Sequence, residues 1–186
     1  MTRNLTKAKL IVLTGMMTAI IAVLSIVQIP MPTGVPITLQ TFAVALSGYV
    51  LGPWMGATTA LLYMLLGLVG IPVFSGFTAG PGVLFGVTGG FIWGFILMAT
   101  LCGIGARMKD TTVGFVVAIA FGVIGLLTCH LLGVLQFSMV TKNSIPASIL
   151  MVSVPYLIKD VASVIGANLV GMAVRKALKA AGVLED

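Results

Sequence analysis

Apolar residues run through this sequence in long stretches, which are separated by short segments rich in proline, glycine or charge. A membrane-spanning helix needs about 20 apolar residues, so a chain of 186 residues has room for about six or seven spans. Prolines and glycines lie at the ends of most stretches, as is typical of helix boundaries. The stretches that we expect to form spans are residues 10–29, 39–51, 53–70, 91–105, 113–137 and about 155–179.

The composition agrees with a membrane protein. Hydrophobic residues make up 59% of the chain and charged residues 8%, whereas a soluble domain has about 25% charged residues. The mean hydropathy of +1.21 excludes a disordered chain. Cys102 and Cys129 lie inside apolar stretches without metal-ligand spacing, so we expect core thiols and no metal site. The sequence predicts one all-α integral membrane domain over residues 1–186 with six transmembrane helices.

Positive charge marks one side of this layout. With six spans, the basic residues on that side are Arg3, Lys7, Lys9, Arg107, Lys109, Arg175, Lys176 and Lys179. The opposite side holds only Lys142, so the positive-inside rule places both termini in the cytoplasm. Segments 30–38, 71–90 and 138–154 then face outward. Non-helical backbone near membrane depth is tolerated where it lines a cavity, so we expect an outward-facing cavity that these loops close.

Asp160 is the one acidic residue inside an apolar stretch, and an ionisable group there is costly enough to indicate a function. Arg175 follows about 22 Å further along a helix, at about 1.5 Å per residue, which places Asp160 in the outer third of the membrane core. Ser153, Tyr156 and Ser163 share its helical face by their three- and four-residue spacing. The alternative is a purely structural ion pair.

Other residues allow both structural and functional interpretations. Lys159 lies about 100° around the helix from Asp160, so it either extends towards the surface or pairs with another group. His130 stands alone in its stretch, where nothing complements it as a catalytic pair, and we expect a hydrogen-bonded interior histidine. Small residues spaced four apart in the first stretch would let a partner helix approach closely. They are Gly15, Thr18, Ala19 and Ala22.

Four motifs occur in order along the chain. Residues 35–40 read Val-Pro-Ile-Thr-Leu-Gln, residues 62–74 run from Leu-Tyr to Gly-Ile-Pro-Val-Phe, residues 86–91 read Gly-Val-Thr-Gly-Gly-Phe, and residues 155–160 read Pro-Tyr-Leu-Ile-Lys-Asp. Together they resemble the signatures of the biotin-specific substrate-binding (S) components of energy-coupling-factor vitamin transporters. Asp160 matches the aspartate of that family, whereas Ser163 stands where the family usually has a lysine.

The resemblance implies a high-affinity biotin-binding subunit without catalytic activity or a cofactor, in a prokaryotic plasma membrane. It implies six helices, outward loops that close over biotin, and assembly with a transmembrane coupling protein and two cytoplasmic ATPases. The small residues of the first stretch would then face the coupling protein. The aspartate of the last motif would take a role in ligand binding.

The functional groups of biotin indicate how such a site would bind it. An ionised Asp160 can accept hydrogen bonds from the ureido N–H groups, and aromatic side chains suit the apolar bicycle. The biotin carboxylate needs donors, for which Lys142, Asn143, Gln40 and loop N–H groups are candidates. The substrate-binding residues that we expect are Thr38, Gln40, Tyr63, Phe74, Thr88, Gly89, Gly90, Trp93, Asn143, Tyr156, Lys159, Asp160 and Ser163.

Other functions stay open on the sequence alone. A membrane enzyme would need a second titratable group or metal ligands near Asp160. A proton-coupled carrier acting alone would show uptake that follows pH and needs no ATPase. An S component for another vitamin would prefer thiamine or riboflavin to biotin.

Overall fold

The computed structural model describes residues 2–107 and 111–184 of this mainly helical protein. Its long helices are α1 (Thr2–Ile26), α2 (Gln40–Leu51), α3 (Pro53–Leu68), α5 (Gly89–Gly105), α6 (Thr112–Thr141) and α8 (Val154–Ala180). The shorter elements are β1 (Gln28–Ile29), β2 (Ile37–Thr38), the 3₁₀ helix η1 (Ser75–Phe77), α4 (Pro81–Leu84) and α7 (Ile145–Val152). Each apolar stretch of the sequence is thus confirmed as a helix.

Length and apolar composition mark helices that suit a membrane. Within the described residues, three segments are long and apolar enough to cross one: Ala8–Ile26, Thr112–Thr141 and Val154–Ala180. Helices α2, α3 and α5 are apolar but shorter, with 10–17 residues each. The helical architecture of a membrane protein is therefore confirmed, and the number of six spans stays a prediction.

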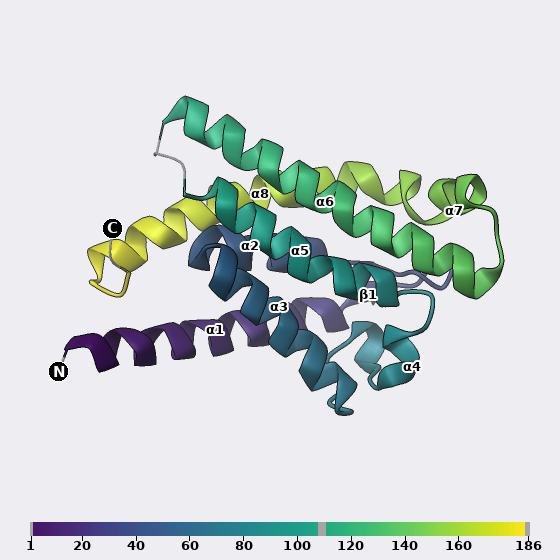
Figure 1. Ribbon diagram of the computed structural model, residues 1–186, viewed down its shortest axis with the longest axis horizontal. Helices are drawn as coiled ribbons and strands as arrows, with labels where there is room; N and C mark the ends of the chain where they lie inside the picture. Colours follow the sequence, from purple (N-terminus) through teal and green to yellow (C-terminus); the bar gives the residue numbers. More distant parts are fainter. Residues whose placement is uncertain (1, 108–110, 185–186) are drawn as a thin grey trace.

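The helices lie lengthwise side by side, and the two ends of the bundle differ (Figure 1). Helix α1 runs along one side, α6 and α8 run along the opposite side, and α2, α3 and α5 lie between them. Both termini lie at one end, while β1, α4 and α7 lie at the other. Fully buried side chains fill the centre, among them Tyr49, Tyr63, Met98 and Leu126.

Glycines let α5 and α6 approach each other closely. A Cβ atom on Gly94 of α5 would lie 2.7 Å from the Cα atom of Cys129 on α6. A Cβ atom on Gly125 of α6 would lie 3.1 Å from the Cα atom of Met98 on α5. Small residues at such an interface allow backbones to come together in membrane helices, where dispersion contacts drive the packing. The pair therefore forms a tight unit that positions the side chains beside these glycines.

Helix α6 is longer than the sequence predicts. We expected this helix to end at residue 137, but it continues to Thr141 and ends where Lys142 adopts a left-handed conformation with φ of 58°. The hydroxyl of Thr141 donates to the carbonyl of Phe137 at 2.7 Å, so a polar side chain is satisfied by the helix itself. Ser144 caps the next helix, because its hydroxyl accepts from the Ala147 N–H.

The segment after α1 is non-helical, as its prolines predict, and forms a hairpin. The first helix ends at Ile26 rather than at residue 29, because Gln28 and Ile29 form β1. Strands β1 and β2 pair in antiparallel register, with Gln28 opposite Thr38. Val35, between the strands, packs into a small apolar cluster with residues of α6, α7 and α8. The Tyr156 hydroxyl of α8 donates to the Val35 carbonyl, which fastens the hairpin loop across the loop end of the bundle.

Candidate ligand-binding site

The carboxylate of Asp160 lies inside the bundle. Asp160 projects from α8, is 5% exposed, and is the only acidic residue in the described segments 2–107 and 111–184. The expectation of an inward-facing polar face is confirmed, because Ser153, Tyr156 and Ser163 are buried as well. A buried carboxylate is costly unless it is paired, so its partners decide what this site can do.

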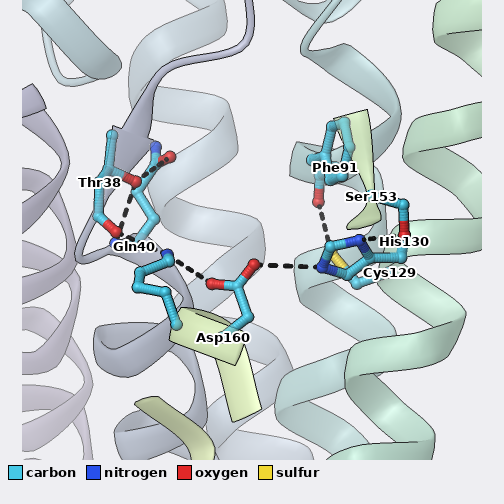
Figure 2. Close-up of polar contacts among 8 residues, drawn as sticks. Thr38, Gln40, Phe91, Cys129, His130, Ser153 and Asp160 are labelled. Carbon is cyan, nitrogen blue, oxygen red and sulfur yellow. Dashed lines mark hydrogen bonds and ion pairs between the residues drawn. The ribbon is translucent and has the colours of Figure 1, made fainter. Parts of the chain in front are cut away.

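Two basic side chains flank this carboxylate (Figure 2). Nε2 of His130 lies 3.1 Å from Oδ2 of Asp160, and Lys159 forms an ion pair with Oδ1. Nδ1 of His130 lies 2.9 Å from the hydroxyl oxygen of Ser153. An ionised carboxylate only accepts, so Nε2 carries a hydrogen, and in a neutral imidazole Nδ1 accepts from the Ser153 hydroxyl. The site therefore holds Asp160 from both sides.

The contact between His130 and Asp160 corrects the expectation that nothing complements this histidine. His130 is a buried, hydrogen-bonded interior residue, as predicted, but its partner is the carboxylate of the candidate site. Phe91 of α5 packs edge-on against the imidazole, with ring centroids 5.6 Å apart and an interplanar angle of 88°. The close α5–α6 packing thus fixes the plane in which the imidazole meets Asp160.

Lys159 connects Asp160 to the hairpin. Besides its ion pair with Asp160, its ammonium donates to the main-chain carbonyl of Thr38 at 2.9 Å. The Thr38 hydroxyl donates to the side-chain oxygen of Gln40 at 2.9 Å, and the Gln40 amide donates to the Tyr63 hydroxyl at 2.8 Å. The expectation that Lys159 extends to the surface or pairs away from Asp160 is therefore wrong, because it pairs with Asp160 itself and also reaches Thr38. The network ties α8 to β2, α2 and α3.

A small cavity of about 50 Å³ adjoins Asp160. It combines a polar side, formed by groups such as Asp160, with an apolar side of aromatic and aliphatic residues. Its lining residues are Val35, Pro36, Thr38, Gln40, Thr41, Phe74, Ser75, Val83, Thr88, Phe91, Ile92, Phe95, Leu126, Cys129, His130, Val152, Tyr156, Lys159 and Asp160. An apolar enclosure with a few converging polar groups is typical of a small-molecule site.

Part of the expected substrate-binding set lines this cavity. These residues are Thr38, Gln40, Phe74, Thr88, Tyr156, Lys159 and Asp160. Tyr63 lies directly behind them, because its hydroxyl accepts from Gln40 and its ring meets Phe74 edge-on at a centroid distance of 5.5 Å. Residues from distant parts of the sequence therefore converge on one place.

The other expected residues lie outside the lining. Gly89 and Gly90 are buried where α5 packs against neighbouring backbone, and Ser163 is buried further along α8. Trp93 is 40% exposed on α5. The Asn143 amide contacts the sulfur of Met151, away from Asp160. These five residues therefore do not line the cavity and belong to the structure around it.

Sequence reasoning missed His130, Thr41 and the apolar lining of α5. A signal for His130 was present, because glycines recur along one face of α6 and include Gly122, Gly125 and Gly133. Such a face marks close helix contact, and a histidine beside it is expected to be buried against the neighbouring helix. Within the described residues, no cluster of three His, Cys, Asp or Glu side chains could hold a metal ion.

Comparisons with known proteins identify the family of this chain. The BioY family matches residues 1–180 of the chain. The biotin transporter BioY of Thermotoga maritima is 38% identical over 162 residues, which cover 87% of this chain and 93% of that protein. The biotin transporter BioY2 of Lactococcus lactis is 37% identical over 174 residues, which cover 93% of each protein.

A solved structure has the same fold. The crystal structure of the S-component for biotin from an ECF-type ABC transporter superposes with a TM-score of 0.81, covers 95% of both chains and is 24% identical in sequence. The resemblance that the four sequence motifs indicated is therefore confirmed by a match over nearly the whole chain. The chain belongs to the BioY family.

Proposed function

We propose that this protein captures biotin as the S component of an energy-coupling-factor importer. Relatives from Thermotoga maritima and Lactococcus lactis are biotin transporters, and the solved structure with this fold is an S-component for biotin. The observation that carries the proposal is the buried Asp160 carboxylate in a cavity with aromatic walls. The protein acts by binding and transport, and it is not an enzyme.

The chemistry of the cavity matches the bicyclic end of biotin. Oδ1 of Asp160 pairs with the Lys159 ammonium, and an ionised carboxylate oxygen has a further lone pair for a second donor. An ionised acceptor of this kind suits a ureido N–H group, since hydrogen bonds to charged groups are the stronger ones. Phe74, Phe91 and Phe95 provide the apolar surface for the ring system.

The loops must move when biotin enters. Sites for small ligands typically have about 300–1,000 Å³, whereas the cavity beside Asp160 has about 50 Å³. A larger cavity of about 360 Å³ lies under the hairpin and the segment around α4. Four residues line both cavities and so form the wall between them: Pro36, Ser75, Val83 and Thr88. We infer that bound biotin extends across this wall from one cavity into the other, and that the Ser75 and Thr88 hydroxyls donate hydrogen bonds to the carboxylate of its tail.

Equilibrium binding to the purified full-length protein tests the proposal. Labelled biotin should bind, and unlabelled biotin should displace it, while thiamine and riboflavin in excess should leave it bound. Preferential binding of either competitor would assign the protein to another vitamin. Absence of binding by all three, in a protein that is folded by circular dichroism, would contradict the function.

Membrane topology forms part of the same proposal. We place the protein in the plasma membrane of a prokaryote with six spans and with both termini in the cytoplasm. The common end of the two termini supports one side of the membrane for both, and the positive-inside rule makes that side the cytoplasm. Cysteine accessibility at Lys142→Cys from outside and at Lys9→Cys from inside tests it, and the reverse pattern would overturn it.

Helix α1 offers the surface for a coupling protein. Gly15 and Ala19 are exposed, and no atom lies within 4 Å of a Cβ atom placed on Gly15. Thr18 and Ala22 are buried against the bundle, so only half of the expected small-residue set is accessible. We propose that the exposed face docks the coupling protein, which works with two ATPases. Gly15→Leu should then prevent co-purification of the coupling module and leave biotin binding unchanged; retained co-purification would exclude this face.

The His130–Asp160 contact favours one alternative, a proton-coupled carrier that acts alone. An imidazole and a carboxylate in direct contact are the groups that a proton relay uses. Uptake in cells that lack the ATPases distinguishes the two functions. Biotin uptake that persists there and rises with the proton gradient would support the carrier, whereas loss of uptake supports the S component.

A further inference from the structure

We propose that the end of the bundle with the two termini binds the phosphate headgroup of an anionic phospholipid. A cavity of about 550 Å³ lies there, and its lining shares no residue with the cavity beside Asp160. It is bounded by α2, the end of α5, the start of α6 and the last turns of α8. Its lining includes Arg107, Thr111, Gly114, Asn168, Arg175 and Lys176.

Basic side chains gather on this cavity. Arg107, Arg175 and Lys176 line it, and Asp160, the one acid of the described residues, lies beside the other cavity. Arg175 is held in place, because one guanidinium nitrogen donates to the Ala106 carbonyl at 2.7 Å. An arginine has five N–H donors in a planar fork, so donors remain for an oxyanion.

A buried donor without a partner points independently to a ligand. Asn168 is 3% exposed and lies on the cavity wall, and its side-chain nitrogen has no hydrogen-bond partner among the described residues. An unsatisfied buried donor costs free energy, so such groups are rare in folded proteins. An oxygen atom of a ligand in the cavity would satisfy this amide.

The start of α6 adds favourable electrostatics. Thr111 caps the helix by accepting from the Gly114 N–H at 3.1 Å, and both residues line the cavity. The first turn of this 30-residue helix therefore directs its positive dipole end towards the same space. Guanidinium, ammonium, amide and helix terminus all favour a phosphate group.

The surroundings favour a lipid over a free anion. Exposed apolar side chains flank the cavity on α6 and α8: Val113 is 72% exposed, Val116 59%, Leu169 54% and Val170 43%. Acyl chains can cover such residues while the headgroup occupies the polar space. Basic pockets between helices on the cytoplasmic side are typical sites for anionic headgroups, and the proposed topology puts this cavity on that side.

Thermal unfolding of the delipidated full-length protein in a neutral detergent tests the inference. Phosphatidylglycerol should raise the unfolding midpoint, because a ligand that binds only the folded state stabilises it. Phosphatidylcholine, inorganic phosphate and glycerol 3-phosphate should not reproduce the shift at equal concentration. An equal shift with phosphatidylcholine would remove the charge argument, and an equal shift with phosphate would assign the site to a free anion.

Charge variants locate the site. The double variant Arg107→Gln, Lys176→Gln should bind phosphatidylglycerol about tenfold or more weakly. Each basic residue near a membrane surface contributes about 1 kcal/mol to the attraction of anionic lipid, and the variant removes two of them. Lys142→Gln removes a charge of the same type at the other end of the bundle and should leave the affinity unchanged. Equal losses in the two proteins would show attraction to the overall charge and would contradict a site.

The variant Asn168→Leu distinguishes a role of this amide in lipid binding from a role in stabilising the fold. Removing an unsatisfied buried amide should raise the unfolding midpoint without lipid and should shrink the shift that phosphatidylglycerol causes. A full lipid shift in this variant would exclude Asn168 from the site. Biotin binding should be unaffected in Asn168→Leu and in the Arg107→Gln, Lys176→Gln protein, so failure of this inference leaves the proposed function intact.

Discussion

The two ends of the bundle differ in their charged side chains, although α8 contributes to both. Near the loops, Asp160 is enclosed by His130 and Lys159, and the adjoining cavity has about 50 Å³. Near the termini, arginines and lysines surround about 550 Å³, and Asp160, the one described acid, lies at the other end. Internal pairing makes the first end suitable for a neutral ligand with N–H donors. Basic side chains such as Arg175 and Lys176 make the second suitable for an anion.

Asp160→Asn should have the largest effect on this comparison. Biotin affinity should fall about tenfold to a hundredfold, since a charged acceptor is lost and an amide presents a donor to the ureido group. Isothermal titration with biotin measures the loss, and Asp160→Glu, which keeps the charge, should recover part of the affinity. The midpoint shift with phosphatidylglycerol should stay as in the parent protein. Unchanged biotin affinity in Asp160→Asn would remove this residue from the site.

Gly94→Ala should affect both ends, because it alters the helix pair between them. The added Cβ atom would lie 2.7 Å from the Cα atom of Cys129, and backbone must shift to accept it. Overpacking of this kind costs about 1–3 kcal/mol, so the thermal midpoint should fall. Gly15→Ala is the matched control, because no atom lies within 4 Å of its Cβ position, and it should be slightly stabilising. Equal midpoints would refute the close α5–α6 contact.

His130→Asn should have the smallest of the three effects. The variant loses the hydrogen bond to Asp160, while Lys159 still neutralises the carboxylate, so biotin affinity should fall about tenfold. Cys129→Ala changes a neighbour in the same lining that has no hydrogen bond to Asp160, and it should change affinity much less. Normal binding with abolished uptake in His130→Asn would instead support the proton-coupled carrier.

Much of the candidate site could be predicted from local patterns. The spacing of Ser153, Tyr156 and Asp160 defines one helical face, and the burial of all three follows from it. The motifs around Thr38 and Gln40 marked a second contribution to the cavity. Trp93 and Asn143 could not be placed in the same way, because they lie outside the four motifs and nothing local predicts the direction of their side chains.

By itself, the sequence determined the helical stretches, the inward face of α8 and the family. These properties depend on hydropathy, helical periodicity and short motifs, which are local. Only the tertiary structure decided that His130 meets Asp160, that Lys159 reaches Thr38, and that Gly15 is exposed while Thr18 is buried. Such contacts depend on the rotation and separation of packed helices, which glycine-mediated close approach sets and which no single stretch of sequence encodes.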